Sequence, residues 1–307
     1  MNASALAESA AKATTDSSTW EVFSQAVVDA TRRLIAQAPS ARFGEPNGVH
    51  QARSAGRRLR GLLWTFRPLL NQDWADRLDQ DLSRFVHALG ASRDLDVLSE
   101  RLTDSAADLA ADLQPLFEDL LARRAAARLA LDEALEDGPF ESLIQCLTEA
   151  AQEPKLADLS HLDDSVDDAS LLSHLARRAW KTLAKRGRAL DESTADEEFH
   201  EVRKRAKRAR YAVEAIVSGL SGRSARRARR FARRLAAVQD ILGDHQDAVV
   251  SREWISTVAA AYPHNPRFQL AAGRLIERRH QVALASRTKF FHAWARLDQP
   301  KLRRWGS

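Results

Sequence analysis

Residues 50–60 read HQARSAGRRLR, and residues 200–210 read HEVRKRAKRAR. Both stretches begin with a histidine and carry cations at the same four offsets. Two further echoes keep nearly the same spacing: LGASRD at 89–94 matches LGDHQD at 242–247, and ARR at 122–124 matches ERR at 277–279. Several motifs repeated in the same order at a near-constant interval indicate an internal duplication.

Composition favours helix nearly everywhere. The 307 residues include only 12 Gly, 9 Pro and 2 Tyr, a usage that suits helices packed into one large or two medium cores. The single cysteine, Cys146, stands in the apolar stretch FESLIQCL at 140–147 and is predicted to be a buried, inert thiol. One cysteine excludes an intramolecular disulfide, in keeping with a reducing compartment.

Neither a membrane span nor a secretion signal is predicted. No apolar run approaches the length that crosses a bilayer, and residues 1–19 are rich in Ala, Ser and Thr without a hydrophobic stretch. Residues 1–19 are therefore interpreted as a flexible tail and not as a signal peptide. The sequence predicts a soluble, cytoplasmic protein without membrane contact.

Charge is divided unevenly along the chain. Residues 1–170 carry 17 Lys and Arg against 29 Asp and Glu, a net charge of −12, whereas residues 171–307 carry 30 against 13, a net charge of +17. A half this basic predicts a polyanionic partner or an acidic protein surface, unless its charges are merely solvated. The placement of the charges on the helices decides between these interpretations.

The two basic stretches form stripes. At about 100° per residue, four residues of the first stretch share an arc of roughly 80°, opposite the apolar residues of the same helix: His50, Arg53, Arg57 and Arg60. The second stretch repeats this with His200, Arg203, Lys207 and Arg210, widened by Lys204. Like charges at such spacings repel by roughly 0.2–0.5 kcal/mol per pair, so stripes with few acids favour a binding role over a solvated surface.

Two more cationic faces follow in the second half. One comprises Arg223, Arg226, Arg227, Arg230, Arg233 and Arg234, and a weaker one comprises Arg177, Arg178, Lys181, Lys185 and Arg188. Because the apolar backs of all these helices must meet in a core, we expect the four faces to converge on one groove.

Helix signals divide the chain into two units. The first is predicted as helices over about 20–37, 49–70, 72–90, 92–113 and 115–137, with Gly90 ending the third and Pro115 starting the last. The second repeats this order from 170 to 296. The predicted domains are a tail (1–19), a first bundle (20–151), an acidic linker (152–169), a second bundle (170–296) and a basic tail (297–307). The linker can alternatively fold back over the basic groove as a competitor.

In order and in duplicate, these motifs resemble the CHAD domain, the conserved-histidine α-helical domain. The resemblance covers about residues 20–296 and rests on both His-x-x-Arg stretches, on LGASRDLDV at 89–97, on KRARY at 207–211 and on the Leu-Gly-x-x-x-Asp at 242–247. It implies an all-α fold of two four-helix bundles related by a pseudo-twofold axis. It also implies binding of inorganic polyphosphate in a central basic cavity and association with polyphosphate granules. No Glu-x-Glu-x-Lys signature of a neighbouring triphosphate-tunnel domain is found near the start, so the chain resembles the stand-alone form.

Carried over residue by residue, the resemblance assigns polyphosphate contacts to both copies. The candidates are His50, Arg53, Arg57 and Arg60, then His200, Arg203, Lys204, Lys207, Arg208 and Arg210, with Arg230 and Arg234 from the third basic face. Arginine forks match paired phosphate oxygens, and histidine adds a hydrogen bond or a charge. Gln246 stands in place of Arg93 in the second copy, which departs from the repeat. The charge imbalance between the halves predicts a lopsided cavity to which the second bundle contributes more.

Several alternatives stay open. Asp94 and Asp247 are interpreted first as acids in the first turn of a new helix, and second as partners of the groove arginines. His50 and His200 can instead be helix N-terminal residues bonded locally. No metal-ligand spacing, phosphate-binding glycine loop or nucleophile elbow is found, so no metal, cofactor or catalysis is predicted.

Two rival functions remain at this stage. Basic helices suit a nucleic-acid-binding module, although the stripes contain few aromatic residues beyond Trp64 and Tyr211. A phosphohydrolase would use His50 or His200 with Asp94 or Asp247, but the sequence shows no carboxylate cluster for the metal that such chemistry usually needs. Other granule proteins are further candidate partners.

Overall fold

The computed structural model describes residues 19–157 and 168–303. As predicted, the described chain is all-α, with one isolated β-bridge and no strands. The first half contains α2 (Thr19–Arg42), α3 (Pro46–Phe66), η2 (Arg67–Leu69), α4 (Gln72–Ser105), η3 (Ala107–Asp112), α5 (Gln114–Ala134) and α6 (Asp137–Gln152). The second half contains α7 (Asp168–Gly187), α8 (Asp196–Ile216), η4 (Val217–Gly219), α9 (Gly222–Ala260), α10 (Pro266–Leu297) and η5 (Pro300–Arg303).

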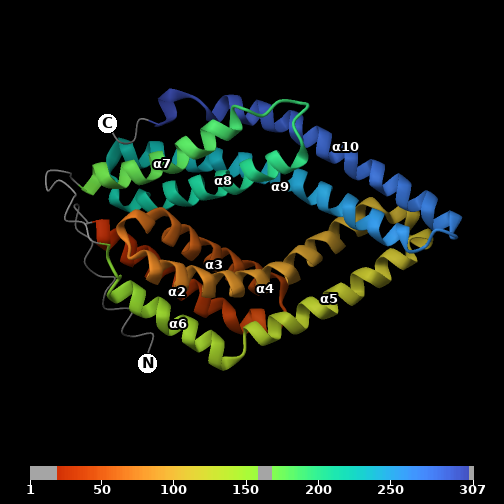
Figure 1. Ribbon diagram of the computed structural model, residues 1–307, viewed down its shortest axis with the longest axis horizontal. Helices are drawn as coiled ribbons and strands as arrows, with labels where there is room; N and C mark the ends of the chain where they lie inside the picture. The colour runs from red at the N-terminus through yellow and green to blue at the C-terminus, as the bar shows by residue number, and fades with distance from the viewer. Residues whose placement is uncertain (1–18, 158–167, 304–307) are drawn as a thin grey trace.

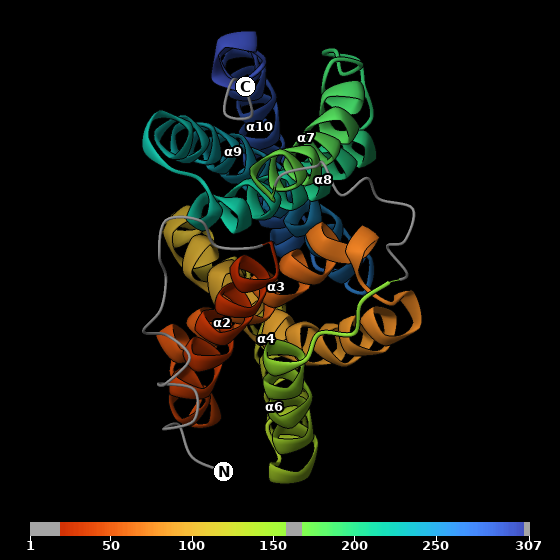
Figure 2. The ribbon, with the colours of Figure 1, turned by 90° about the vertical axis from the view of Figure 1, so that its left-hand side faces the viewer.

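The two halves lie one above the other. Figure 1 shows α7, α8 and α10 on one side and α2, α3 and α6 on the other, and Figure 2 shows the same division from the end. The order α2, α3, η2, α4 of the first half recurs as α7, α8, η4, α9 in the second. The repeated motifs therefore lie on equivalent helices, with the basic stretches on α3 and α8.

Two predicted helix ends are wrong. Gly90 lies inside α4, which runs unbroken for 34 residues, and Gly243 lies inside α9, which runs for 39. The segments predicted at 72–90 and 92–113 are thus mostly one helix. A glycine destabilises a helix interior by only about 1 kcal/mol, and the tertiary contacts of a long helix outweigh that.

Local signals hold better at helix starts. Pro115 stands in the first turn of α5, as predicted. The side-chain oxygens of Asn71 and Asn265 cap α4 and α10 by accepting hydrogen bonds from backbone N–H groups at 3.1 and 3.2 Å. By contrast, α2 continues through Pro39 into one more turn. Capping chemistry is local, so it is visible in the sequence.

One apolar core joins the two halves. Its largest fully buried side chains include Phe23 and Phe66 from the first half and Phe199, Phe231 and Phe290 from the second. All five belong to one continuous cluster. Because the apolar faces of α3 and α8 are buried in this cluster, their basic faces are turned out of it.

Within this core, α3 and α8 meet at a glycine. A Cβ atom added at Gly61 would lie 2.7 Å from the Cβ of Tyr211, so only glycine allows this approach. Gly61 and Tyr211 each directly follow their basic stretch, which makes them counterparts in the repeat. A residue that faces its own counterpart is what a local twofold axis produces.

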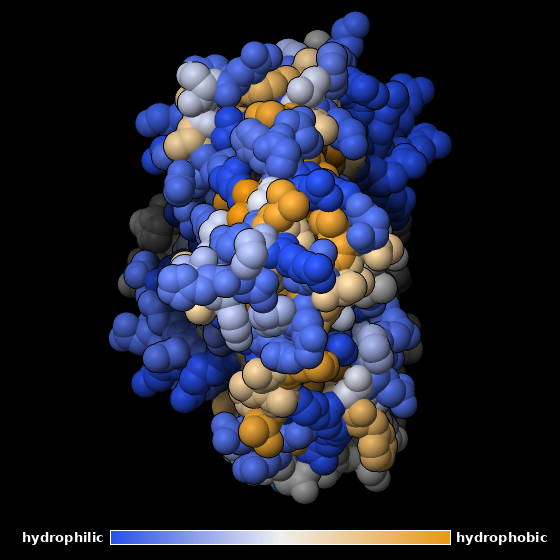
Figure 3. Space-filling view, turned by 90° about the vertical axis from the view of Figure 1, so that its right-hand side faces the viewer, coloured by the Kyte–Doolittle hydropathy of each residue, from blue (hydrophilic) through white to orange (hydrophobic). Residues whose placement is uncertain are grey.

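A second apolar cluster closes the opposite end of the molecule. There Leu102 of α4 and Leu116 of α5 belong to one cluster with Phe268 and Leu275 of α10. Figure 3 views this end and shows polar side chains over most of the face, with a few hydrophobic ones between them. The helices are therefore joined at both ends, and α4 and α9 run from one cluster to the other.

Two further expectations concern the surface and the linker. Cys146 is exposed on α6, so the predicted buried thiol is wrong; Leu143 and Leu147 form the buried side of that helix. The predicted linker starts in an ordered contact, because Leu156 pairs with Leu70 in an antiparallel bridge. Residues 1–18, 158–167 and 304–307, which carry most of the predicted linker and tails, lie outside the described residues. The domain boundaries themselves stay predictions.

Gly61→Ala is expected to destabilise the fold by about 1–2 kcal/mol, because the new methyl group forces α3 away from α8. The matched control is Gly273→Ala in α10, where an added Cβ meets no atom within 4 Å. Helix propensity alone should make that control more stable by about 1 kcal/mol. Urea unfolding of both variants measures the two shifts, and equal stabilities would contradict the close crossing of α3 and α8.

Candidate functional site

A cavity of about 730 Å³ lies between the two halves. Side chains of α3, α4 and α5 line it from the first half, and side chains of α8 and α9 line it from the second. Leu89 and Leu242 belong to the larger apolar cluster, and Leu102 and Trp254 belong to the smaller one. The cavity walls are therefore the parts of α4 and α9 that run between the two clusters.

The lining of this cavity is strongly basic. It contains seven arginines and only three aspartates. The arginines are Arg53, Arg57, Arg93, Arg101, Arg123, Arg203 and Arg210, and two histidines, His50 and His200, stand among them. The structure thus brings together six of the predicted residues, three from each basic stretch: His50, Arg53, Arg57, His200, Arg203 and Arg210.

An arginine lies over each of the two glycines inside the long helices. A Cβ atom at Gly90 would lie 3.5 Å from Nε of Arg53, and a Cβ atom at Gly243 would lie 3.8 Å from Nε of Arg203. The two guanidinium groups thus rest against α4 and α9 at equivalent places. The glycine of the Leu-Gly motif leaves room for an arginine side chain from the neighbouring helix. This contact explains why the motif recurs without ending a helix.

The counterpart arginines differ in their partners. Asp94 accepts two hydrogen bonds from Arg53, at 2.6 and 3.0 Å. Its counterpart Asp247 instead lies 3.1 Å from Arg101, a residue of the first half. Arg203 forms no ion pair within the described part of the chain, and its buried Nε finds no hydrogen-bond acceptor there. The second half therefore presents the less neutralised arginine of this pair. The predicted larger contribution of the second bundle to the lining is nevertheless wrong, because five of the seven lining arginines come from the first half.

The first interpretation of the two aspartates is wrong. Asp94 lies inside α4 and Asp247 lies inside α9, so neither begins a helix. The second interpretation, ion pairing with groove arginines, holds for Asp94 and Arg53. Burial raises the pKa of Asp247 even though Arg101 and Arg203 act in the opposite direction. The carboxylates thus hold arginines in place while neutralising only part of the charge.

Arg57 and Lys207 are counterparts that share one crowded, half-buried region. Burial and repulsion from Arg57 and the neighbouring arginines lower the pKa of Lys207 to about 7. Burial and repulsion from Arg53 lower the pKa of Arg57 to about 10. Neither side chain forms an ion pair with any residue that the structure describes. Like charges so arranged favour whatever anion relieves them.

The two histidines sit in different surroundings. His50 lies at the cavity edge, where burial and repulsion from Arg93 and other arginines lower its pKa. His200 contacts Gln246 of α9, with 2.6 Å between Nδ1 and Oε1, so it is not bonded locally. When the amide oxygen accepts this hydrogen bond, Nδ1 carries the hydrogen and Nε2 donates only in the protonated ring.

Several predicted residues of these two helices lie outside the lining. Arg60 donates two hydrogen bonds to Asp79 of α4, at 2.7 and 3.1 Å. Lys204 is exposed and pairs with Glu201 on its own helix. Arg208 is exposed as well. Lys207 is half-buried beside the lining and contributes through its charge.

The third and fourth basic faces do not reach this cavity, since none of their residues lines it. Arg230 is exposed on α9, and Arg234 lines a separate groove between α9 and α10. Arg188, directly after α7, donates to Asp298 at 2.6 and 2.8 Å. The expected convergence of all four faces is wrong, because only the crossing of α3 with α8 turns basic faces toward each other.

The sequence patterns do not single out Arg93, Arg101 or Arg123 as contacts, yet all three line the cavity. Arg93, Val97 and Arg101 recur every four residues and form one face of α4. That spacing is visible in the sequence, because all three residues fall within the helix predicted over 92–113.

Two further findings apply to the described ranges only. No helix there is both long and apolar enough to cross a bilayer. Across the same residues, no three His, Cys, Asp or Glu side chains come together as a metal site requires.

Fold and cavity together define an all-α protein in which a duplicated helical unit frames a basic cavity. The CHAD domain family matches residues 25–256, and the chain belongs to that family. The CHAD domain from the plant Ricinus communis has a similar structure, with a TM-score of 0.67, 26% identity and coverage of 92% of this chain and 95% of that one. PptA from Streptomyces chartreusis shares the fold at a TM-score of 0.75, with 20% identity and coverage of 91% and 100%.

Curated relatives come from Mycobacterium tuberculosis. They are named Uncharacterized protein Rv2226 and Uncharacterized protein MT2285, and each is 25% identical to this chain over 282 residues. The matches cover 90% of this chain and 53% of each relative. The chain therefore spans about half the length of the curated relatives it matches.

Lys207→Met is expected to stabilise the free protein at pH 7, because it removes a cation from a half-buried cluster of cations. Between about pH 7 and 10.5 the unfolded chain holds the Lys207 proton and the folded chain has lost it. The wild-type unfolding free energy should therefore rise with pH in this range, and the advantage of the variant should shrink. Urea unfolding at several pH values in phosphate-free buffer measures both trends.

The control for this experiment is Lys204→Met, three residues away on the exposed side of α8. Its stability difference from wild type should stay constant with pH. If the stability difference between Lys207→Met and wild type also stayed constant with pH, the neighbouring cations would not be lowering the pKa of Lys207.

Proposed function

We propose that this protein binds inorganic polyphosphate in the cavity between α3, α4, α8 and α9. One observation carries the proposal: Arg57, Arg203 and Lys207 lie together beside the cavity without an ion pair in the described part of the chain. Three under-neutralised cations in one half-buried place predict an anionic ligand. Membership of the CHAD domain family supports the same ligand.

The chemistry of the polymer suits this cavity. Linear polyphosphate carries about one charge per unit and has no bases to be read, so charge-assisted hydrogen bonds are sufficient for recognition. Arginine forks match paired phosphate oxygens, and lysine supplies a compact charge. The volume of about 730 Å³ suits a segment of a thin, unbranched chain, and the opposed stripes of α3 and α8 can hold such a segment from two sides.

Asp94 and Asp247 have a positioning role in this proposal. Asp94 orients Arg53 through two hydrogen bonds, and Asp247 holds Arg101. Arg57, Arg203 and Lys207 have no such partners among the described residues, so they are the groups that gain most from a phosphate. Because two of these three belong to α8, the polymer is expected to lie nearer to α8 than to α3.

Nucleic acid is the rival ligand. Stacking of bases needs exposed aromatic faces, but Tyr211 is only 9% exposed and Trp254 only 7%. The indole of Trp254 is also held by a hydrogen bond of 2.6 Å to Asp119. Competition separates the two ligands: polyphosphate should displace labelled RNA at much lower phosphate concentration than RNA displaces polyphosphate.

We further propose binding without catalysis, in the cytoplasm, at polyphosphate granules, where other granule proteins are candidate partners. Shortening of polyphosphate by the protein in the presence of Mg²⁺ or Mn²⁺ would overturn the proposal of binding without catalysis. A fluorescently tagged protein that stays diffuse in cells rich in granules would overturn the proposed association with granules.

Replacing both Arg203 and Lys207 with Gln is expected to weaken polyphosphate binding strongly. The slope of log K against log salt should fall in magnitude by about 1.5, since each lost phosphate contact removes roughly 0.7–0.9. The control replaces Lys204 and Arg208 with Gln, two exposed cations of the same helix that do not line the cavity. Calorimetric titration at two salt concentrations measures both variants. Equal losses would place the ligand on the outer surface of α8.

Binding is also expected to take up a proton between about pH 7 and 9. Lys207 is partly neutral in the free protein because its pKa lies at about 7, and an adjacent polyanion raises that pKa. Affinity should therefore fall as pH rises through this range. Titrations in buffers of different ionisation enthalpy count the protons, and the variant Lys207→Gln should take up fewer. Identical uptake by the two proteins would contradict the role of Lys207.

A further inference from the structure

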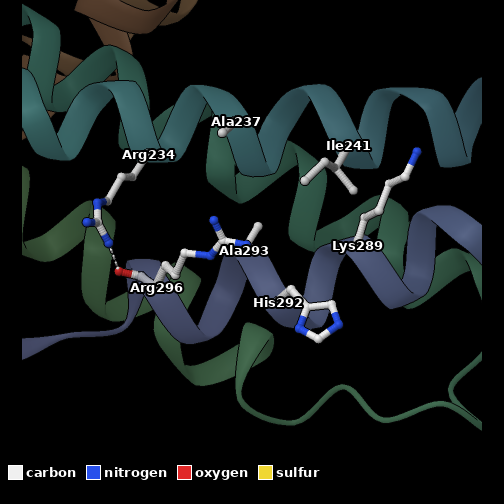
Figure 4. A pocket seen from close by; sticks show the side chains of 7 residues that line it. All are labelled: Arg234, Ala237, Ile241, Lys289, His292, Ala293 and Arg296. Carbon is white, nitrogen blue, oxygen red and sulfur yellow. Dashed lines mark hydrogen bonds between the residues drawn. The ribbon is translucent and has the colours of Figure 1, made fainter.

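A second basic hollow lies away from the central cavity, between α9 and α10. Its volume is about 470 Å³. Figure 4 shows its floor of Ala237, Ile241 and Ala293, with charged side chains along both helices. The basic residues that line it are Arg234, Lys289, His292 and Arg296. We call this hollow the outer groove.

The outer groove contains cations without acids. Residues 222–239 of α9 and 278–297 of α10 include no Asp or Glu, and the two segments meet where Arg234 donates to the main-chain carbonyl of Arg296. Lys289, His292 and Arg296 are all exposed. No carboxylate lines the groove, so an incoming anion meets no competing negative charge there.

A row of arginines extends from this groove along α9. Arg223, Arg226, Arg229, Arg230 and Arg233 are exposed and form no ion pair with any described residue. Other arginines near the surface are neutralised by a carboxylate, as in the pairs Arg67–Asp76 and Arg278–Asp108. A helix face of about 27 Å over 18 residues that stays unneutralised carries mutual repulsion, which a polyanion relieves along its length.

We infer that the outer groove and this arginine row form a second binding surface for a phosphate polymer. The inference rests on the proposed function in its choice of ligand, but it concerns a different site. Base stacking is not supported here, because Phe231, Phe290 and Trp294 of these segments are buried and the half-buried Phe291 does not line the groove. The apolar floor and the cations at the edges suit a thin chain that carries charge on every unit.

Two binding surfaces on one molecule change what the protein does to long chains. A chain held in the central cavity of one molecule can engage the outer groove of another, so that protein and polymer become cross-linked. Linked binding events of this kind raise the overall affinity without new contacts. Short chains should occupy the two sites separately.

The test uses the double variant Lys289→Glu with Arg296→Glu, two exposed groove residues, in the full chain. The matched control is Arg33→Glu with Arg77→Glu, two exposed arginines of α2 and α4 with the same change in charge. Titration with sodium tripolyphosphate at low salt should give two binding events for wild type and for the control. The groove variant should keep one binding event. With long-chain polyphosphate, wild type should scatter light because protein and polymer become cross-linked, and the groove variant should not.

Each outcome bears on the inference. Equal stoichiometry and scattering for the groove variant and the control would overturn it. Loss of duplex DNA binding with unchanged polyphosphate binding would overturn it too, because the surface would then serve nucleic acid. Scattering without any polymer, lost in the groove variant, would assign the surface to a second copy of the chain and reject the polymer. The variant with Arg203 and Lys207 replaced by Gln should keep the outer event alone. If it keeps both events, the proposed function fails while the inference stands.

Discussion

Repulsion among half-buried cations is the constraint on which the rest of this structure depends. Arg57 and Lys207 occupy equivalent positions in the repeat. Burial and neighbouring arginines lower the pKa of both side chains, and Arg57 is one of the arginines that lower the pKa of Lys207. The apolar backs of α3 and α8 hold them there, because those backs belong to a core that both halves share. Burial of the phenylalanines thus offsets an arrangement of charge that is unfavourable in itself.

The strain is distributed unequally between the halves. In the first half, Arg53 forms an ion pair with Asp94, and Arg60 forms one with Asp79. In the second half, Arg203 keeps no such partner among the described residues. The lining itself is also unequal: the first half supplies five of its seven arginines and only one of its three aspartates, so the wall from the first half is the more cationic one. The net charges of −12 and +17 along the chain are therefore not repeated in the lining of the cavity.

The imbalance of charge along the chain has its consequence on the outside of the molecule. Because the second half has few acids, α9 and α10 face each other across a groove whose polar lining residues are all basic. The central cavity differs in that aspartates hold its arginines in set orientations. The central cavity, with its positioned arginines, and the outer groove, without such positioning, can bind one polymer at different points along its length.

The repeat, the all-α class and the pairing of His50 with His200 could be predicted from the sequence, because duplicated motifs and the helical period are local patterns. Helix starts at Pro115 and Asn71 were equally local. Cys146 was not predictable, since its neighbours on α6 are apolar and only the packing decides which side of the helix is buried. Gly90 was misleading for a related reason: a glycine signals a helix end unless a neighbouring helix needs the space.

By itself, then, the sequence determined which helices form and which of their faces are basic, since both follow from the residues within one or two helical turns. Only the tertiary structure decided which basic faces meet. The contact of Gly61 with Tyr211 turns the stripes of α3 and α8 toward one cavity. The first half of α9 packs elsewhere and presents its arginines on the outside. A crossing between helices far apart in the chain depends on shape complementarity over many residues, and no local pattern records it.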